Sequence, residues 1–369
     1  MRHALFALLL VGCVDQDPIV SDASPAEPLL SSQAQALSFG APVPGPGGWG
    51  AGDERGNGNT QGYATRLRCA LQLANPKARV YELGRTLSES MPQGPFADAP
   101  LSLQYLPTRG IPFTAHSGNG EVLSGGLGSQ GTQFDALGHF GYLDVPWSGA
   151  GPFPADQTHY YNGFTQGDVK PSPEGPMQHL GVDKAVPIMT SAIMLDAEAY
   201  RGRPLEAGER VTAADIKGML HAQHLNHRGI LPGDAVFVHT GWGRFWADPS
   251  PDPAQTPYYA EGPGLAVDAQ EYLAARFVVL MGLDNPFTDP VAACQLTGAC
   301  PPPVGSLPNL PFSVHHKNLT QKGIHQIQNL DLEALAHDNV GLSCALILPL
   351  RILGAAGSAV RPIAVGAPD

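Results

Sequence analysis

Two ionisable side chains lie four residues apart in the segment SQGTQFDALGHFGY, which covers residues 129–142. Asp135 supplies a carboxylate and His139 an imidazole, and Gln130 and Gln133 add amide groups beside them. The apolar residues around them indicate burial, and buried ionisable groups are costly unless they are paired or liganded. The pattern is typical of a metal site or a general-base site. A satisfied polar turn is the alternative without chemistry.

A second group of candidate residues lies far along the chain. His315 and His316 stand next to each other just before a predicted helix, in the segment VHHKNLTQKGIHQIQNLDLEAL. Gln328 lies near the end of the strand that is predicted to follow this helix. A site that used both groups would require the fold to bring these residues to Asp135 and His139.

The elements that must position these residues are short apolar strands that alternate with helices. This alternation predicts an α/β chain whose mixed or parallel sheet is buried by helices. Two further segments, 101–106 and 111–114, are short and polar-edged. Strands are predicted at residues 80–83, 192–196, 235–239, 277–282, 326–330 and 341–348, and helices at residues 63–74, 212–223, 267–275 and 319–324.

Polar residues stand at the ends of three predicted strands. Asp196 ends one strand, His239 and Thr240 end the next, and Asp284 and Asn285 follow a third. In open α/β sheets the residues at strand ends often carry the chemistry. These positions are therefore further candidates for functional residues.

The composition indicates a globular protein and excludes one kind of partner. Of the 369 residues, 43% are hydrophobic and 15% are charged, which is typical of a folded chain. The formal net charge is −12, and the chain has neither a cluster of Lys and Arg nor a GxxxxGK[ST] phosphate loop. Because binding to nucleic acid requires clustered basic side chains, we expect no nucleic-acid partner. We expect a small-molecule substrate instead, bound by one catalytic domain at residues 45–369.

The first residues resemble a targeting segment. Basic Arg2 precedes an apolar run at residues 4–11 that is too short to span a bilayer, and the run leads into Cys13. Small residues before such a cysteine are typical of a bacterial lipoprotein signal, so residues 1–13 are predicted to be the signal and lipidated Cys13 the anchor to a membrane surface. An ordinary secretory signal is the alternative. Residues 14–44 are predicted to be a flexible linker, and either signal predicts an extracytoplasmic location.

Four cysteines remain once Cys13 is set aside for lipid. In an oxidising compartment an even number of cysteines can pair. Cys294 and Cys300 enclose the short loop QLTGA, and we predict a disulfide between them. Cys344 lies in the apolar run GLSCALILPL, which is typical of a buried thiol. The partner of Cys69 stays open.

The segment SQGTQFDALGH resembles the signature H-x-G-T-H-x-D-x-P-x-H of the kynurenine formamidase-like cyclase family. Other segments agree in order: WGAGDERG, YYNG, LPGDAVFVHTGWGRFW, GLDNP and GIHQIQNLDLEALA. The similarity covers roughly residue 49 to the C-terminus. It implies a single compact α/β domain in which helices flank a mixed, β-barrel-like sheet. It also implies hydrolysis of amides, lactones or cyclic imide-like substrates with one or two divalent metals, commonly zinc or manganese, and a possible homo-oligomer.

The resemblance assigns roles to individual residues. Asp135 matches the Asp of the signature, a metal ligand, and His139 matches its last His, which serves as general base or acid. Downstream the family has a second-site His, which His316 matches best by its spacing to Gln328, with His315 as the alternative. Gln328 stands where the family has a ligating Glu.

Several positions depart from the family pattern. Ser129 and Gln133 stand where the signature has its first two His, and Leu137 stands where it has Pro. Gln328 likewise replaces a carboxylate. An amide oxygen is a weak, neutral ligand that suits hard ions better than zinc. Asp135, Gln133, Gln328 and one of the adjacent histidines are still predicted to hold a divalent ion.

Two functions are consistent with this sequence. The first is a hydrolase of a C–N or C–O bond in a small cyclic or acylated substrate, in which a metal lowers the pKa of water and His139 transfers the proton. The second is a protein that binds a small molecule on a hydrolase scaffold that has lost catalysis. The missing ligands favour the second hypothesis, and the pair of Asp135 and His139 favours the first.

Overall fold

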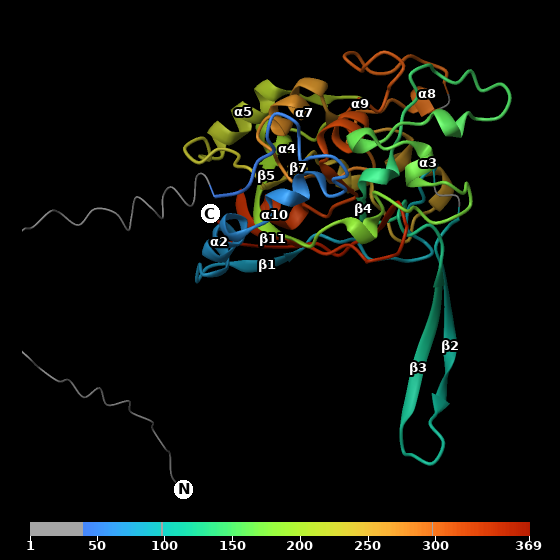
Figure 1. The fold of residues 1–369 in the computed structure, drawn as a ribbon. Coiled ribbons are helices and arrows are strands. Elements are labelled where there is room, and N and C mark those ends of the chain that lie inside the picture. The colour runs from blue at the N-terminus through green and yellow to red at the C-terminus, as the bar shows by residue number, and fades with distance from the viewer. Residues whose placement is uncertain (1–39, 97–98, 297) are drawn as a thin grey trace, which may run out of the picture.

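A mixed sheet of nine strands curls into a half-barrel at the centre of the protein (Figure 1). The computed structural model describes residues 40–96, 99–296 and 298–369. The four central strands are parallel to one another, and the remaining neighbours are antiparallel. Across the sheet the order is β1 (Arg79–Glu82), β13 (Ile363–Gly366), β11 (Leu342–Ile347), β5 (Ile188–Asp196), β7 (Ala235–His239), β9 (Leu280–Leu283), β10 (His325–Gln328), β4 (Gln133–Asp135) and β12 (Gly357–Ala359).

Helices lie along both faces of this sheet, and most of them are short. β6 (Arg210–Val211) and β8 (Gly264–Leu265) form a small separate ladder. The π-helix η8 (His316–Lys322) continues directly from α9. The α-helices are α2 (Tyr63–Leu73), α3 (Gln166–Val169), α4 (Ala197–Arg201), α5 (Ala213–Ala222), α6 (Pro257–Ala260), α7 (Val267–Ala274), α8 (Ala293–Leu296), α9 (Ser313–His315) and α10 (Glu333–His337).

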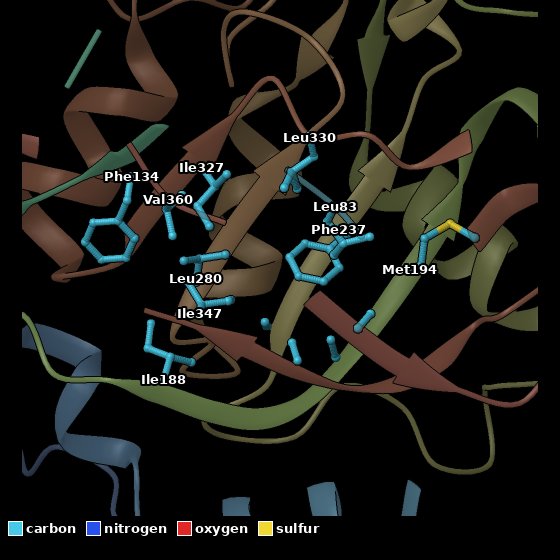
Figure 2. Packing of buried hydrophobic residues seen from close by; sticks show 14 of the residues in the cluster. Leu83, Phe134, Ile188, Met194, Phe237, Leu280, Ile327, Leu330, Ile347 and Val360 are labelled. Atoms are coloured by element: carbon cyan, nitrogen blue, oxygen red, sulfur yellow. The ribbon is translucent and has the colours of Figure 1, made fainter. Parts of the chain in front are cut away.

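The sheet has a core on each face because side chains alternate along each strand. In β5, Met194 points to the concave face and Ile193 to the opposite face, and in β7 the same holds for Phe237 and Val238. Figure 2 shows the concave cluster, in which residues from several strands point toward one another. On the opposite face, α5 and α7 pack onto the alternate residues.

Local signals define the ends of these elements. At the start of α5, Thr212 Oγ1 accepts a hydrogen bond from the backbone N–H of Asp215, and the Asp215 carboxylate accepts one from the Thr212 N–H. This reciprocal pair is a capping box, which satisfies backbone N–H groups at the start of the helix. At the end of α4, Gly202 has a φ of +71°, a left-handed conformation that glycine adopts at little cost.

Helix α2 is attached to the sheet by a buried ionic group and a disulfide. The carboxylate of Asp234, which is fully buried, accepts hydrogen bonds from Arg228 and lies 3.5 Å from Arg68 of α2. Cys69 of α2 is bonded to Cys344 of β11. The expectation that Cys344 is a free buried thiol was therefore wrong. Residues 275 positions apart met only through the packing of α2 on the sheet.

A long hairpin projects away from the rest of the protein (Figure 1). Its strands are β2 (Ser102–Gly110) and β3 (Ser117–Ser124), so the strand at β2 is longer than the segment 101–106 that the sequence marked, and residues 111–114 belong to the turn. Gln130 holds the base of the hairpin, because its side chain bonds the backbone of Leu101 and Ala99. The hairpin contributes no residue to the two sheet cores.

The predicted fold class is confirmed: one α/β domain with a mixed, half-barrel sheet and flanking helices. The predicted disulfide between Cys294 and Cys300 is confirmed as well. The signal at residues 1–13 and nearly all of the linker at residues 14–44 lie outside the described residues. Within the described part of the chain, each helix is too short or too polar to cross a bilayer.

Candidate active site

Strands β4 and β10 place three polar side chains on one face of the sheet. Gln328 is paired directly with Gln133, and Asp135 follows Gln133 by two residues, so the three side chains lie on the same face. The alternate residues, Phe134 and Ile327, enter the concave core (Figure 2). The alternation along two paired strands therefore assembles the polar group.

Asp135 is the centre of this group and is fully buried. Its Oδ2 accepts a 2.7 Å hydrogen bond from Nε2 of Gln328. Nε2 of His139 lies 3.9 Å from Asp135 Oδ1, and Nε2 of His315 lies 3.8 Å from Asp135 Oδ2. One carboxylate is thus approached by two imidazoles that come from separate segments of the chain.

His139 reaches the group from η2 (Leu137–His139), a 3-10 turn that directly follows β4. The turn is held in place by the backbone, because Gly138 N–H donates to the carbonyl of Leu180. The side chain of His139 is 27% exposed, whereas that of Asp135 is fully buried. His139 is therefore the titratable group of the site that a substrate or a water molecule can reach.

His315 is oriented by a second carboxylate. Nδ1 of His315 lies 2.6 Å from Oδ2 of Asp289, and the same carboxylate accepts hydrogen bonds from the backbone N–H groups of Val314 and His315 at the start of α9. When Nδ1 of His315 carries the proton and donates it to Asp289, Nε2 on the other side of the ring faces Asp135. This is the arrangement in which a carboxylate fixes the tautomer of a histidine that ligates a metal or shuttles a proton.

Burial by itself lowers the pKa of His315, because a buried imidazolium is poorly solvated. The hydrogen bond and the charge of Asp289, together with the charge of Asp135, outweigh burial, so the pKa of His315 is raised above its ordinary value. In the protein without metal, His315 therefore tends to carry a proton between two carboxylates.

Three buried oxygens of the site have no hydrogen-bond partner. They are Oε1 of Gln133, Oδ1 of Asp135 and Oε1 of Gln328. A buried oxygen without a partner is destabilising, and native proteins rarely leave several of them together. Carboxylate and amide oxygens are ligands for hard divalent ions, and imidazole is a ligand for Zn. The residues that are present therefore fit a divalent cation.

A cavity of about 390 Å³ opens in front of these side chains. His139, His315, Gln133 and Gln328 line one side of it, and Ser129 lies at its edge. Much of the remaining wall is aromatic. The rings of Phe96, Phe140, Phe287 and Phe312 stand 6.0–6.5 Å from their neighbours, in mostly edge-to-face arrangements. The cavity thus combines a polar floor with apolar walls, as expected of a site for a small molecule.

The structure brings together Asp135, His139, Gln133, Gln328 and His315, but it places His316 elsewhere. The ring of His316 contacts Thr320 and Gln321 within η8 and packs edge-on against Tyr142. His316 does not line the cavity. The preference for His316 over His315 rested on spacing alone, and the tight winding of α9 into η8 turns the two adjacent rings in different directions. His315, the alternative, is the histidine that faces Asp135.

A second ionisable group lies at the ends of the parallel strands, away from this cavity. His239, Asp284 and Glu333 each offer a ligating atom, and these atoms lie within 4.8 Å of one another. Among the residues that the structure describes, this is the only such set of three His, Cys, Asp or Glu. The polar strand ends His239 and Asp284 were visible in the sequence, but Glu333 was missed because it stands in a helix with no special pattern.

The fold defines a class of protein: single α/β domains built on a curled mixed sheet, which in this chain brings a carboxylate and two imidazoles together beside a cavity. The chain belongs to the cyclase family, because the family model described as "Putative cyclase" matches residues 81–290, more than half of the chain. The match includes Asp135, His139, His239 and Asp284. The predicted family resemblance is thereby confirmed.

Solved structures support the same fold. The crystal structure of a novel cyclase is 21% identical and has a TM-score of 0.68, with 86% of this chain and 95% of that chain covered. An isatin hydrolase bound to the product analogue thioisatinate is 18% identical with a TM-score of 0.52, covering 81% and 96% of the two chains. Isatin hydrolase A from Labrenzia aggregata, bound to benzyl benzoate, is 17% identical with a TM-score of 0.50, covering 80% and 96%. No curated protein matches the chain significantly. At these identities the likeness establishes the fold alone.

Proposed function

We propose that the protein is a hydrolase that cleaves a C–N or C–O bond in a small cyclic or acylated substrate, such as an amide, a formamide or a lactone. The observation that carries this proposal is the convergence of His139 and His315 on Asp135, beside an aromatic-walled cavity that both histidines line. The membership of the cyclase family and the fold shared with isatin hydrolases agree with it.

Asp135 and His315 would hold a divalent ion, Zn or Mn, and the free oxygens of Gln133 and Gln328 would complete its ligands. Such an ion supplies a water of lowered pKa and polarises the substrate carbonyl. Asp289 prepares His315 for this role, because it accepts a hydrogen bond from Nδ1 and so turns Nε2 toward Asp135 and Gln328.

His139 is the general base and acid in this proposal. Its Nε2 lies 3.9 Å from Oδ1 of Asp135, a position in which a carboxylate can orient the ring while it takes a proton from water. Because His139 is partly exposed at the cavity, it can then pass this proton to the leaving nitrogen or oxygen. The phenylalanine walls exclude bulk water, which strengthens the electrostatic interactions within the site.

The aromatic walls also indicate the shape of the substrate. Rings that stand edge-to-face leave flat apolar surfaces, and such walls suit a planar, apolar body next to the scissile carbonyl. We therefore expect aryl formamides, aryl lactones and cyclic aryl imides or amides to be better substrates than aliphatic analogues.

The test is hydrolysis of a panel of aryl and aliphatic formamides, lactones and cyclic amides, with the metal-free protein and after addition of Zn²⁺ or Mn²⁺. His139→Ala should lower kcat by about 10²–10⁴-fold if the residue transfers the proton. His337→Ala is the matched control, because His337 lies on the surface with its side chain 86% exposed. Unchanged activity in His139→Ala would refute the role given to His139.

A second candidate function is the binding of a small molecule without catalysis. The observation that favours it is the amide side chain at Gln133 and at Gln328, where the family resemblance implies a His and a Glu. A protein that binds a planar ligand in the cavity, contains no metal and hydrolyses none of the panel would support this alternative. Stoichiometric metal in the purified protein would support the hydrolase.

We propose further that the protein acts outside the cytoplasm, anchored through lipidated Cys13. The two disulfides support this location, because disulfides persist mainly in oxidising compartments. Cys13→Ser should release the protein from the membrane fraction into the soluble fraction, and a variant that stays in the membrane fraction would contradict the anchor.

The exposed hairpin of β2 and β3 supports a homo-oligomer, since a lone two-stranded ribbon is marginally stable in water. Light scattering of the purified protein measures that state.

A further inference from the structure

Three parallel strands end at one edge of the sheet with ionisable side chains. Asp196 ends β5, His239 ends β7, and Asp284 follows β9. Asp196 and His239 are register partners, and β7 and β9 are paired along their length. Because the strands are parallel, their carboxyl ends meet at the same edge, which is where open α/β sheets place ligand sites.

His239 is oriented at this edge as a metal-ligating histidine is oriented. Its Nδ1 lies 3.0 Å from Oδ1 of Asp196, which fixes the tautomer. Asp196 is itself held by the backbone N–H of Ala199. The side chain of His239 is 4% exposed, and its Nε2 is buried without a hydrogen-bond partner. A buried imidazole nitrogen with a prepared tautomer and no partner is therefore aimed at the space in front of it.

Carboxylates surround that space on three sides. Nε2 of His239 lies 3.5 Å from Glu333 Oε1, 3.7 Å from Glu198 Oε2 and 4.0 Å from Asp284 Oδ2. Ligands about 2.0–2.1 Å from a tetrahedral ion stand about 3.3–3.4 Å apart. The ligand atoms of His239, Asp284 and Glu333 all lie within 4.8 Å of one another, so they would have to move inward to reach that spacing.

Hydrogen bonds fix one oxygen of the Asp284 carboxylate, and the other oxygen faces His239. Its Oδ1 accepts hydrogen bonds from the N–H and the hydroxyl of Thr240, at 2.9 and 2.7 Å. Oδ2 accepts only a long 3.3 Å bond from the N–H of Gly243. The backbone of Gly241 lies close to the Glu198 carboxylate, because a side chain at this position would clash with Oε2 of Glu198. The residues around the carboxylates thus hold them in place.

Two arginines lie near this group, and the charge of Arg85 acts on Glu333 and that of Arg244 on Glu198, but neither forms an ion pair with them. Arg244 donates to the carbonyls of Gly241 and Leu205, and Arg85 forms its ion pair with Asp331. Neither arginine is within ion-pair distance of the carboxylates that face His239. Asp196 and Asp284 are largely buried, and apart from His239 their hydrogen-bond partners in the described part of the chain are neutral N–H and hydroxyl groups, so a cation at this place would be favourable.

We propose that His239, Asp284 and Glu333 form a second divalent transition-metal site, with Glu198 beside it, separate from the cavity next to Asp135. Imidazole with carboxylates suits Zn²⁺, Co²⁺ or Mn²⁺. Glu333 and Glu198 are 53% and 32% exposed, so an ion can enter from solvent and lose its water at the buried end.

The site has a direct connection to the candidate active site. Asp284 begins the segment 284–289, in which Phe287 forms part of the cavity wall and Asp289 orients His315. The carbonyl of Asp284 also accepts a hydrogen bond from Tyr258, next to the cavity residue Tyr259. An ion at the strand ends would therefore order the segment that shapes the active site, which makes its role structural rather than catalytic.

The competing explanation is that His239 is protonated and that its positive charge, without a metal, stabilises the surrounding carboxylates. Burial lowers the pKa of His239, but the hydrogen bond to Asp196, the ion pair with Glu333 and the charge of Asp284 raise it to about 11. A protonated imidazole in contact with the carboxylates would partly neutralise them. An ion must displace this proton, so its affinity should rise with pH. Titration with Co²⁺ distinguishes a bound metal from a protonated histidine.

The experiment is a Co²⁺ titration of chelator-treated full-length protein, followed by calorimetry and by the visible absorption of bound Co²⁺. It is done in an Asp135→Asn background, which removes the carboxylate of the cavity site. We expect one bound equivalent in this background and none after the further change Glu333→Gln. Asp196→Asn should weaken binding by about 10–100-fold, as the loss of an orienting partner does. Glu271→Gln, which removes a surface carboxylate that pairs with Lys317, is the matched control and should bind as its parent.

The proposal is overturned if the Asp135→Asn protein binds no Co²⁺, or if Glu333→Gln leaves its binding unchanged. If Asp135→Asn fails to fold, Glu333→Gln is compared with the natural sequence, and a loss of one equivalent is required. Glu333 is half exposed, so this substitution is compatible with the fold. The readout is metal content and not activity, so the outcome is independent of the proposed hydrolysis.

Discussion

His325 is a buried histidine directly behind the candidate active site, and it should make the protein sensitive to acid. Its side chain is 1% exposed, and its ring packs against Phe134 at 4.7 Å between centroids. Nδ1 lies 3.1 Å from the carbonyl oxygen of Asp135, to which the neutral ring donates. Burial lowers the pKa of His325 to about 4, outweighing the hydrogen bond and charge of Asp135.

The sign of the effect follows from the two pKa values. The unfolded imidazole titrates near ~6.5 and the folded one near 4, so the unfolded chain binds the proton first as the pH falls. The stabilisation is fully present above the unfolded pKa and is lost as the pH falls through the folded pKa. Integrating the proton linkage gives a loss of about 2 kcal/mol by pH 5 and about 3 kcal/mol by pH 4.

His325→Phe isolates this contribution from the other acid-sensitive groups. Phenylalanine keeps a ring against Phe134 but loses the hydrogen bond to Asp135, so the variant should be about 1 kcal/mol less stable near pH 7. Because it cannot take up the proton, it should be about 1 kcal/mol more stable than the natural protein at pH 5. The two stability curves should therefore cross.

Urea unfolding of both proteins between pH 7 and pH 4.5 measures this crossing. The slopes of the unfolding curves should agree, so that the difference in midpoint reports stability alone. A difference between the two proteins that stays constant from pH 7 to pH 5 would refute the reasoning. So would a pKa near 6.5 for His325, measured by NMR on histidine-labelled protein.

Three further predictions concern the residues that hold the site and the fold. Asp289→Asn should lower the pKa of His315, because burial is then opposed only by the charge of Asp135; NMR titration of the metal-free protein checks this, and an unchanged pKa would contradict it. Asp234→Ala should cost about 3–5 kcal/mol in chemical unfolding, because two arginines lose their buried carboxylate, and a cost below 1 kcal/mol would show that water replaces it. Cys69→Ser should lower stability by about 2–5 kcal/mol in oxidising buffer; the difference from the natural protein should vanish when both are fully reduced.

The closeness of Asp135 and His139 could be expected from the sequence, but the second histidine beside Asp135 could not. The spacing of Asp135 and His139 is local, and the structure places them at the end of β4 and in the turn after it. His315 and His316 are adjacent, and only the winding of α9 and η8 determines which ring faces Asp135. The orienting carboxylate Asp289 had no signal in the sequence, because it lies in a loop far from both.

Cysteine pairing and the hairpin show the same difference between short and long range. The disulfide of Cys294 and Cys300 closes a loop of a few residues and was predictable from spacing. The bond of Cys69 to Cys344 depends on how α2 lies against β11. The hairpin was seen as two short segments, since its residues, such as Tyr105 at 76% exposure, lack the alternation that burial of one face imposes.

The sequence by itself determined the α/β class, the cyclase family, the Asp135–His139 pair and the polar ends of the parallel strands. Each of these depends on residue types within a few positions, where the periods of helix and strand act directly. Only the tertiary structure decided which histidine joins Asp135, which carboxylate orients it, and that Glu333 and Glu198 complete the group around His239. The physical reason is that these contacts join segments that are distant in sequence, and the curl of one sheet and the packing of helices on it set the distance between them.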